Sequence, residues 1–249
     1  MSYFRTTKVS EGYAKSRPYF HPEVIKRIKS YLGLKHKFQR ALDVGCGTGL
    51  SSLALKEIAE SIIGVDSSEA MIDSAIKDER IEYFNYPAEY LPFDQEFELI
   101  TLAGSINWID RVKFFREAKR LLSPDGFVVV YDNTILEIME EDSHFKNWYQ
   151  EVYLKKFPKP PRDEFPMTKE EARAYGFEFA HSETYTNKVK FSHDRFIDYL
   201  FTQSEITVAL DNEEVDTIRG WLSSSLEPFF QSQERTLIFG GDIWYLKNT

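Results

Sequence analysis

The chain has 249 residues, of which 42% are hydrophobic and 29% charged, and its formal net charge is −9 at pH 7. These values are typical of a soluble globular protein with one large domain, or with one domain that carries an insertion. The acidic balance and the lack of a long basic stripe argue against a nucleic-acid partner, because phosphate contacts dominate that kind of affinity.

The sequence also shows no pattern typical of a targeting or membrane-spanning segment, and it contains too few cysteines for a disulfide. The N-terminal residues lack the apolar run of a signal peptide, and no stretch approaches the ~20 apolar residues of a membrane span. Cys46 is the single cysteine, so no intramolecular disulfide can form. The histidines show no metal-like spacing, so we expect no metal site. We expect a cytoplasmic protein that is a monomer or a homodimer.

Strands and helices alternate through the first half of the chain. Helical spacing predicts four helices, over residues 21–28, 50–60, 67–76 and 112–122. Short apolar runs predict five strands, over residues 40–44, 61–66, 81–84, 97–103 and 127–131, with a turn at 123–126. Strands this apolar are typical of a parallel sheet covered on both faces. We therefore predict an α/β, Rossmann-like, doubly wound and mostly parallel seven-stranded sheet with right-handed crossovers.

The pattern becomes less regular after Asp132. Residues 133–180 contain short helical patches and four prolines, and we interpret them as a helical, lid-like insertion. Residues 181–249 predict further elements: a strand at 184–191, helices at 194–206 and 212–226, and a strand at 235–246 interrupted at Gly240-Gly241 by a bulge or turn. We predict a single domain over residues 1–249, in which residues 38–132 form the ligand-binding half.

A glycine loop lies between the first predicted strand and the helix after it. Gly45, Gly47 and Gly49 alternate there, whereas the dinucleotide fingerprint requires a glycine at position 50, where Leu50 stands. Asp43 directly before the loop suits an ammonium group, or a water bound to it, and would repel a pyrophosphate. The alternative for Asp43 is a carboxylate that organises the loop. Cys46 is interpreted as a small residue that fits the turn.

A second acid, Asp66, ends the second predicted strand about 20 residues after the loop, where a carboxylate can accept both hydroxyls of a ribose. The alternative is an N-cap for the following helix.

Four segments in this order resemble the motifs of class I S-adenosylmethionine-dependent methyltransferases. They are residues 42–49 (LDVGCGTG), 64–71 (GVDSSEAM), 88–93 (AEYLPF) and 122–126 (LSPDG). Residues 13–22 (YAKSRPYFHP) and 105–110 (SINWID) are similar to segments of the small-molecule branch that includes trans-aconitate and quinone-biosynthesis methyltransferases. The resemblance implies S-adenosylmethionine as cofactor.

The same resemblance implies a set of cofactor-binding residues: Asp43, Gly45, Cys46, Gly47, Gly49, Asp66, Ser67, Met71, Ala88, Glu89, Ala103 and Arg17. Pro87 stands where the family often has an aspartate that contacts adenine, so that contact passes to the backbone of Ala88 or to Glu89. The alternative for Arg17 is a surface salt bridge.

The acceptor is expected beyond the fourth and fifth strands and under the insertion. Its candidate contacts are Tyr13, Tyr19, Ser105, Asn107, Trp108 and Trp148. Asn107 replaces a usual histidine, so acid–base help from that position is in doubt. No catalytic residue is assigned, and the candidates are Asn107 and His144. Aromatic residues between 145 and 157 form one helical face, which either packs onto the domain or caps an apolar acceptor.

The leading hypothesis is methyl transfer to oxygen or carbon of a small-molecule acceptor by in-line displacement. One alternative is a non-catalytic S-adenosylmethionine-binding regulatory module. Another is methylation of RNA or protein, although residues 104–107 read Gly-Ser-Ile-Asn and lack an amine-positioning motif.

Overall fold

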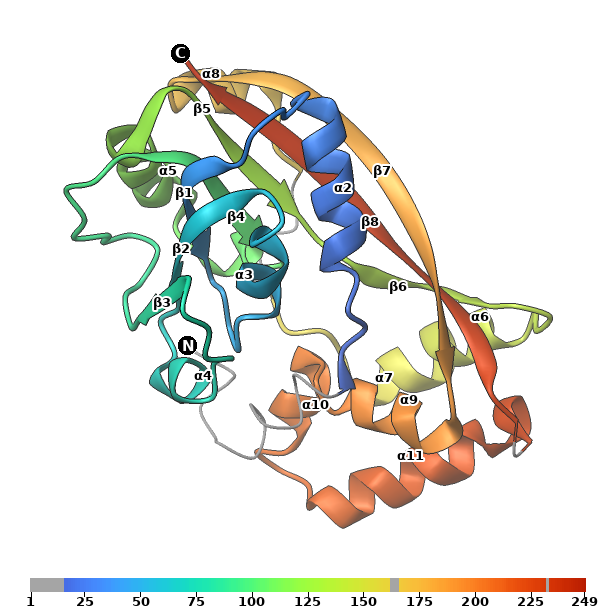
Figure 1. Cartoon of the computed structure of the whole chain (residues 1–249). Helices are drawn as coiled ribbons and strands as arrows, with labels where there is room; N and C mark the ends of the chain where they lie inside the picture. Colours follow the sequence, from blue (N-terminus) through green and yellow to red (C-terminus); the bar gives the residue numbers. More distant parts are fainter. Residues whose placement is uncertain (1–15, 162–165, 232) are drawn as a thin grey trace. The chain divides into compact units, whose positions relative to one another are not determined.

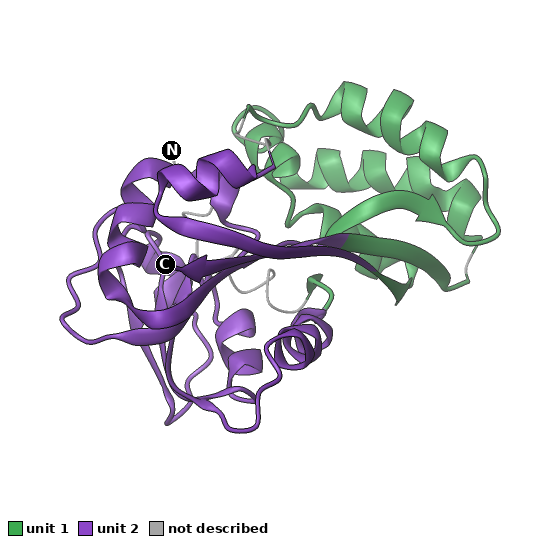
Figure 2. Ribbon diagram, turned by 90° about the horizontal axis from the view of Figure 1, so that it is seen from above, with its two compact units in different colours: residues 1–18, 134–161, 186–240 green, residues 19–133, 162–185, 241–249 purple. Residues whose placement is uncertain are grey.

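A computed structural model describes residues 16–161, 166–231 and 233–249 (Figure 1). Contacts divide the described residues into two compact units (Figure 2). Unit 1 comprises residues 16–18, 134–161 and 186–240, and unit 2 comprises residues 19–133, 166–185 and 241–249. Strands β7 (Phe177–Phe191) and β8 (Arg235–Asn248) contribute residues to both units.

Unit 2 contains the predicted parallel sheet. Its strand order is β3-β2-β1-β4-β5, and β8 is antiparallel to β5 from Phe127↔Lys247 to Tyr131↔Ile243. The parallel strands are β1 (Phe38–Val44), β2 (Ala59–Val65), β3 (Ile81–Phe84), β4 (Phe97–Ala103) and β5 (Leu122–Tyr131). The helices are α2 (His21–Tyr31), α3 (Leu50–Leu55), α4 (Glu69–Asp73), η1 (Ile106–Trp108), α5 (Arg111–Leu121) and α8 (Lys169–Ala174).

Two apolar clusters cover the two faces of this sheet. Leu42 and Val44 of β1 point into one cluster together with Phe114 and Phe115 of α5. Ala41, the neighbour of Leu42 in the strand, points into the other, where α2 and α3 supply Val24, Ile25, Ala54 and Leu55. Because successive side chains of a strand face opposite sides, both faces of β1 are buried. The prediction of a doubly wound, mostly parallel sheet is confirmed.

Unit 1 is built around an aromatic core. β6 (Thr134–Met139) is antiparallel to β8 from Thr134↔Gly240 to Met139↔Leu237. The helices are α6 (Phe145–Trp148), the π-helix η2 (Tyr149–Tyr153), α7 (Leu154–Lys156), α9 (His193–Leu200), α10 (Ser204–Ala209) and α11 (Val215–Phe230). The buried aromatic side chains include Phe145, Trp148, Tyr149, Tyr153 and Phe157. Packing therefore accounts for this helical face, and an acceptor cap is not needed to explain it.

Several local predictions differ from the structure. The sheet has eight strands instead of seven. The turn predicted at 123–126 is a bulge within β5, where the pairing jumps from Phe97↔Leu122 to Leu99↔Phe127 and Asp125 has a φ of 62°. The helix predicted over 67–76 is limited to α4. Contacts assign 134–161 to unit 1 and 166–180 to unit 2, so the lid-like insertion remains a prediction.

The predicted interruption at Gly240-Gly241 is also absent, since β8 is continuous through both residues. Gly241 instead allows β8 to pass close to Asp132. A Cβ at position 241 would collide with the carbonyl and carboxylate oxygens of Asp132. Two hydrogen bonds join β8 to the residue after β5 at this point. Asp132 N–H donates to the Asp242 carbonyl (3.3 Å), and Asp242 N–H donates to Asp132 Oδ1 (3.1 Å).

We predict that Gly241→Ala destabilises the protein by about 1–3 kcal/mol, the usual cost of forcing atoms into a packed site. Gly220→Ala is the matched control, because a Cβ at that position in α11 meets nothing within 4 Å. The control should gain about 0.5–1 kcal/mol from helix propensity. Urea denaturation followed by circular dichroism measures both changes, and equal midpoints for the two variants would contradict the assignment.

Candidate functional site

The glycine loop connects the carboxyl end of β1 to α3. Gly45, Gly47 and Gly49 have φ values of 71°, 54° and 85°, a left-handed conformation that residues with a side chain rarely adopt. A Cβ on Gly45 would collide with Ser105, and one on Gly49 with the hydroxyl of Tyr83. At Gly47 a Cβ would meet nothing within 4 Å, so this glycine is required by its backbone conformation and has open space beside it.

Asp43 organises the base of this loop. Its side chain is fully buried; Oδ2 accepts hydroxyl hydrogen bonds from Ser51 and Ser52 (both 2.6 Å), and Oδ1 accepts one from Thr101 (3.0 Å). Burial raises the pKa of Asp43, and the three hydroxyls partly oppose that change. These hydrogen bonds agree with the alternative of a loop-organising carboxylate, although the donors are hydroxyls instead of the expected backbone N–H groups. The ligand contact of Asp43 remains a prediction.

Asp66 lies beside the loop, directly after β2. Its Oδ2 accepts a hydrogen bond from Gly47 N–H (2.9 Å), and its Oδ1 accepts one from Ser68 N–H (2.8 Å). The N-cap residue of α4 is Ser68, so Asp66 lies two residues before the cap and is not the N-cap of that helix. A carboxylate offers about four acceptor positions, so two further hydroxyls can still bind. Burial raises the pKa of Asp66, and the two N–H donors act in the opposite direction.

Two other loop residues have buried side chains. Thr48 Oγ1 is buried and has no hydrogen-bond partner among the described residues. Cys46 is 5% exposed, and burial raises the pKa of its thiol well above the ordinary value. A thiol held neutral in this way agrees with the interpretation of Cys46 as a small packing residue.

The remaining predicted cofactor residues of unit 2 lie on α4 or just before it, on the 87–92 segment and at the end of β4. Met71 and Ala88 are buried, Ala103 is half-buried and Ser67 is exposed. Glu89 accepts a hydrogen bond from Asp110 N–H (2.8 Å), which ties its segment to the start of α5.

Four predicted acceptor contacts lie in unit 2, three of them after β4 and one before α2. Ser105 donates its hydroxyl to the Val44 carbonyl (2.8 Å) and fills the space beside Gly45, so packing accounts for it. Asn107 is half-buried in η1, and Trp108 is 37% exposed. Tyr19, before α2, is 48% exposed. Their substrate roles remain predictions.

Three predicted site residues belong to unit 1. Arg17 donates to Thr202 Oγ1 (2.9 Å) and to the Thr202 carbonyl (3.0 Å), and its guanidinium lies over the ring of Tyr199. Trp148 is buried and donates to Ser225 Oγ. His144 is exposed and precedes α6. Tyr13 lies outside the described residues. The structure therefore gives Arg17 and Trp148 partners within unit 1, and their ligand contacts remain predictions.

Sequence reasoning missed one buried polar pair. His21 Nδ1 lies 3.1 Å from Tyr131 Oη, and both side chains are buried. The two residues are 110 positions apart, so no local spacing could have indicated their contact.

A hollow of about 670 Å³ in unit 2 is lined by residues that include Arg40, Ser61, Glu82, Asp94 and Phe97. Arg40 and Ser61 stand near the beginnings of β1 and β2, whereas the glycine loop follows the end of β1. The hollow contains none of the predicted site residues.

A comparison with known proteins matches the part of the chain that contains the loop. Residues 42–130 match the family described as "Methyltransferase domain". Over these residues the chain is similar to that methyltransferase domain. The glycine loop, Asp66 and the 87–92 segment all fall within the matched residues. A Saccharomyces cerevisiae relative, 27% identical over 136 residues, is described as an S-adenosylmethionine-dependent methyltransferase.

Named relatives of the methyltransferase domain support this assignment. A Dictyostelium discoideum protein described as a methyltransferase is 27% identical over 149 residues, which are 58% of this chain and 56% of that protein. Demethylmenaquinone methyltransferase of Clavibacter sepedonicus is 34% identical over 98 residues, which are 37% of this chain and 40% of that protein. The chain thus spans about half the length of the curated relatives it matches.

A solved structure supports the fold. It is described as a type II methyltransferase from Anaeromyxobacter dehalogenans and aligns with a TM-score of 0.63 at 23% identity, covering 84% of this chain and 89% of that chain. Within the described ranges, no helix of our chain is both long and apolar enough to cross a bilayer.

We predict that Asp43→Ala destabilises the methyltransferase domain by roughly 2–4 kcal/mol, because three buried hydroxyls lose a charged acceptor. Asp73→Ala, an exposed change on α4, is the control and should stay within about 0.5 kcal/mol of the wild type. Chemical denaturation measures both. A loss for Asp43→Ala no larger than that of the control would show that the carboxylate does not organise the loop.

Proposed function

We propose that the chain is an S-adenosylmethionine-dependent methyltransferase that transfers a methyl group to oxygen or carbon of a small-molecule acceptor. The observation that carries the proposal is the position of Asp66. Its carboxylate is tied to Gly47 of the glycine loop and retains acceptor positions for a pair of vicinal hydroxyls, which the ribose of the cofactor provides.

The residues of the loop fit this cofactor. Open space beside Gly47 and the buried Thr48 hydroxyl provide room and a polar partner near the loop backbone. Asp66 would hold the ribose, the loop backbone the methionine portion, and Met71 with Ala88 the adenine. Asp43 would act indirectly, by holding α3 and β4 against the loop.

The cofactor supplies a methyl group that is already activated by its attachment to a sulfonium sulfur. The work left to the chain is mainly alignment of the acceptor in line with the carbon–sulfur bond, and positioning of this kind contributes up to about 7–11 kcal/mol. Asn107 and Trp108 leave β4 next to Ser105, which packs against the loop, so they are the proposed acceptor contacts within unit 2.

The choice of a small-molecule acceptor rests on two observations. The Clavibacter relative is named for methylation of demethylmenaquinone, a small molecule. The net charge of −9 disfavours a polyanionic acceptor such as RNA.

A second candidate function, a non-catalytic cofactor-binding module, is favoured by Asn107, because an amide neither accepts nor releases a proton near pH 7.

The experiment that tests the proposal has two stages. Calorimetry with S-adenosylhomocysteine should first show saturable binding of one equivalent. Product formation from S-adenosylmethionine should then be measured over a panel of phenols, quinols, carboxylic acids and amines, with bulk tRNA as the nucleic-acid control. Turnover of a phenol, quinol or acid supports the proposal. Absence of binding refutes it, binding without turnover favours the non-catalytic module, and turnover of tRNA alone favours an RNA methyltransferase.

We predict that Asp66→Asn weakens S-adenosylhomocysteine binding by about 10- to 100-fold, the value of losing a hydrogen bond to a charged group. Asp73→Asn is the control and should bind as the wild type does. An equal affinity for Asp66→Asn and wild type, measured by calorimetry, would contradict the ribose assignment.

The affinity of the wild type should also depend on pH with a definite sign. The ionised carboxylate of Asp66 is the form that accepts two hydroxyl protons, so affinity is highest above its pKa and falls about tenfold per pH unit below it. Because burial raises that pKa, the fall should begin at a higher pH than for an ordinary aspartate near 3.9. Asp66→Asn should lack this dependence, and calorimetry at several pH values tests it.

A further inference from the structure

Tyr83 of β3 reaches from its strand to the glycine loop. It pairs with Gly64 of β2, where a Cβ would lie 2.7 Å from Tyr83 Cδ1. A Cβ on Gly49, the last glycine of the loop, would collide with Tyr83 Oη. The ring therefore lies beside β2 and ends against the loop, in a space that exists because Gly64 and Gly49 have no side chains.

Gly49 is the residue at which the loop becomes a helix. It is the N-cap of α3 and has a φ of 85°. Its N–H donates to the Cys46 carbonyl (2.9 Å), and its carbonyl accepts a hydrogen bond from Leu53 N–H (2.9 Å). The first bond closes the loop and the second joins it to α3. A ring packed against Gly49 therefore acts on the loop and on the start of the helix together.

The ring, and not the hydroxyl, is the part of Tyr83 that favours this arrangement. Its Oη is buried and has no hydrogen-bond partner among the described residues. Burial raises the pKa of Tyr83, and the Ser52 hydroxyl, which itself donates to Asp43 (2.6 Å), opposes this rise to a smaller extent. A buried hydroxyl without a partner costs stability, whereas a packed aromatic ring adds to it. Tyr83 also packs against the apolar cluster that includes Leu55 and Ile81.

β3 also positions the proposed ribose-binding residue. Asp66 N–H donates to the Phe84 carbonyl (3.3 Å), and the Asn85 side chain donates to the Asp66 carbonyl (2.9 Å). Phe84 and Asn85 directly follow Tyr83. One strand end therefore contacts both places at which the cofactor would be held, the loop through Tyr83 and Asp66 through the next two residues.

These two places must lie at a fixed separation. The ribose and the methionine portion belong to one molecule, so a loop that moved relative to Asp66 would lose contact with one of them. The hydrogen bond from Gly47 N–H to Asp66 (2.9 Å) fixes the middle of the loop. Tyr83 provides a second link, at the end of the loop, through Gly49.

We propose that Tyr83 is a positioning residue of the cofactor site, and that its ring keeps the glycine loop in the conformation that receives S-adenosylmethionine. The inference rests on the proposed function. A loop that is already held in its binding conformation needs little further ordering when the ligand arrives. Without the ring, part of that ordering would occur on binding, and the affinity would fall.

Two substitutions separate the ring from the hydroxyl. Tyr83→Leu removes the ring and should weaken S-adenosylhomocysteine binding in calorimetry by about 10-fold, which corresponds to ordering one backbone residue on binding. Tyr83→Phe keeps the ring and should bind as the wild type does. In turnover assays the KM for S-adenosylmethionine should rise for Tyr83→Leu, whereas kcat and the acceptor KM should not change, because the loss concerns cofactor binding alone.

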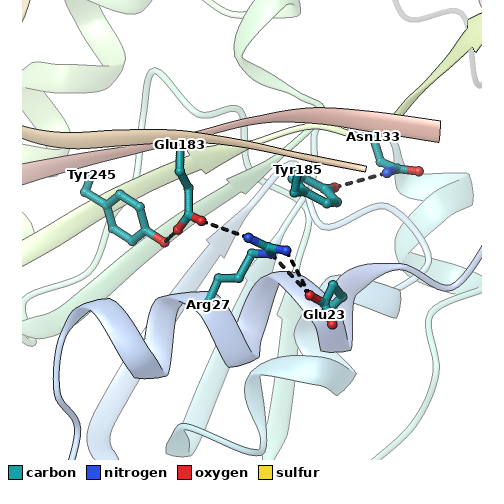
Figure 3. A network of polar contacts seen from close by, with 6 residues as sticks. All are labelled: Glu23, Arg27, Asn133, Glu183, Tyr185 and Tyr245. Atoms are coloured by element: carbon teal, nitrogen blue, oxygen red, sulfur yellow. Dashed lines mark hydrogen bonds and ion pairs between the residues drawn. The ribbon is translucent and has the colours of Figure 1, made fainter. Parts of the chain in front are cut away.

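A polar network elsewhere in unit 2 provides the control for the hydroxyl (Figure 3). Tyr245 of β8 donates its hydroxyl to Glu183 (2.9 Å), and Glu183 also forms an ion pair with Arg27 (3.0 Å). Tyr245→Phe should lower the urea midpoint, because Glu183 loses a hydrogen bond. Tyr83→Phe should not lower it, because Tyr83 Oη has no partner among the residues that the structure describes. Both variants should keep the wild-type affinity for S-adenosylhomocysteine.

A second tyrosine provides the control for the ring. Tyr31 of α2 is 39% exposed and stacks on His181 with ring centroids 4.6 Å apart. Tyr31→Leu should lower the urea midpoint and leave the affinity unchanged, since α2 carries no proposed cofactor contact. This variant shows whether a loss of stability alone changes binding.

A third variant moves the ring without removing it. Gly64→Ala places a Cβ against the ring and against Cys46 Sγ (3.0 Å), and it should weaken S-adenosylhomocysteine binding. In the Tyr83→Leu background the same change should have a smaller effect, because the ring is no longer there to be displaced. If Tyr83→Leu does not fold, Tyr83→Met serves as the ring deletion.

The outcomes are distinguishable. Wild-type affinity in Tyr83→Leu would assign the ring a merely structural role, and an equal loss in Tyr83→Phe would assign the effect to the hydroxyl. A similar loss in Tyr31→Leu would show that affinity follows stability. Each of these results overturns this inference and leaves the methyltransferase proposal intact. A wild type that binds no S-adenosylhomocysteine refutes the proposed function, and the positioning role of Tyr83 is then refuted with it.

Discussion

The buried carboxylate of Asp43 is the interaction on which the candidate site depends. A carboxylate enclosed by protein is unfavourable unless several hydrogen bonds compensate for its lost hydration. Here the donors are Ser51 and Ser52 at the start of α3 and Thr101 in β4. One side chain of β1 thereby fixes the helix after the glycine loop and the neighbouring strand. The left-handed loop residues can then approach Ser105 and Tyr83 as closely as only glycine allows.

The first half of the fold could be predicted because its signals are local. Each strand of the parallel sheet is an apolar run in the sequence. Each glycine of the loop has a left-handed backbone conformation that favours glycine, so the loop is recognisable from its glycines. The predictions were less accurate where geometry depends on distant partners. The bulge at Asp125 arises from the pairing of β5 with β4, and continuity of β8 at Gly241 depends on Asp132, more than 100 residues away.

The same distinction explains the candidate residues. The type of Asp43 was predicted, but its hydroxyl partners could not be, since Thr101 is 58 positions away. Arg17 was interpreted as a ligand contact from its motif, whereas its partners Thr202 and Tyr199 are set by the packing of unit 1. The aromatic residues 145–157 allowed two interpretations from spacing alone. Burial of Phe145, Tyr153 and Phe157 favours packing, because a fully enclosed ring has no face left for a ligand.

The electrostatics of the loop favour a cationic ligand. Asp43 and Asp66 lie close enough for the charge of Asp66 to raise the pKa of Asp43, in addition to the larger effect of burial. An ionised carboxylate is stabilised by any cation placed near it, and the cation is stabilised to the same extent, since the coupling is reciprocal. A sulfonium carries such a charge and the thioether left after methyl transfer does not. The pair of aspartates therefore favours the methylated donor over its demethylated product. This preference follows from charge alone. A loop built for a pyrophosphate would not have it.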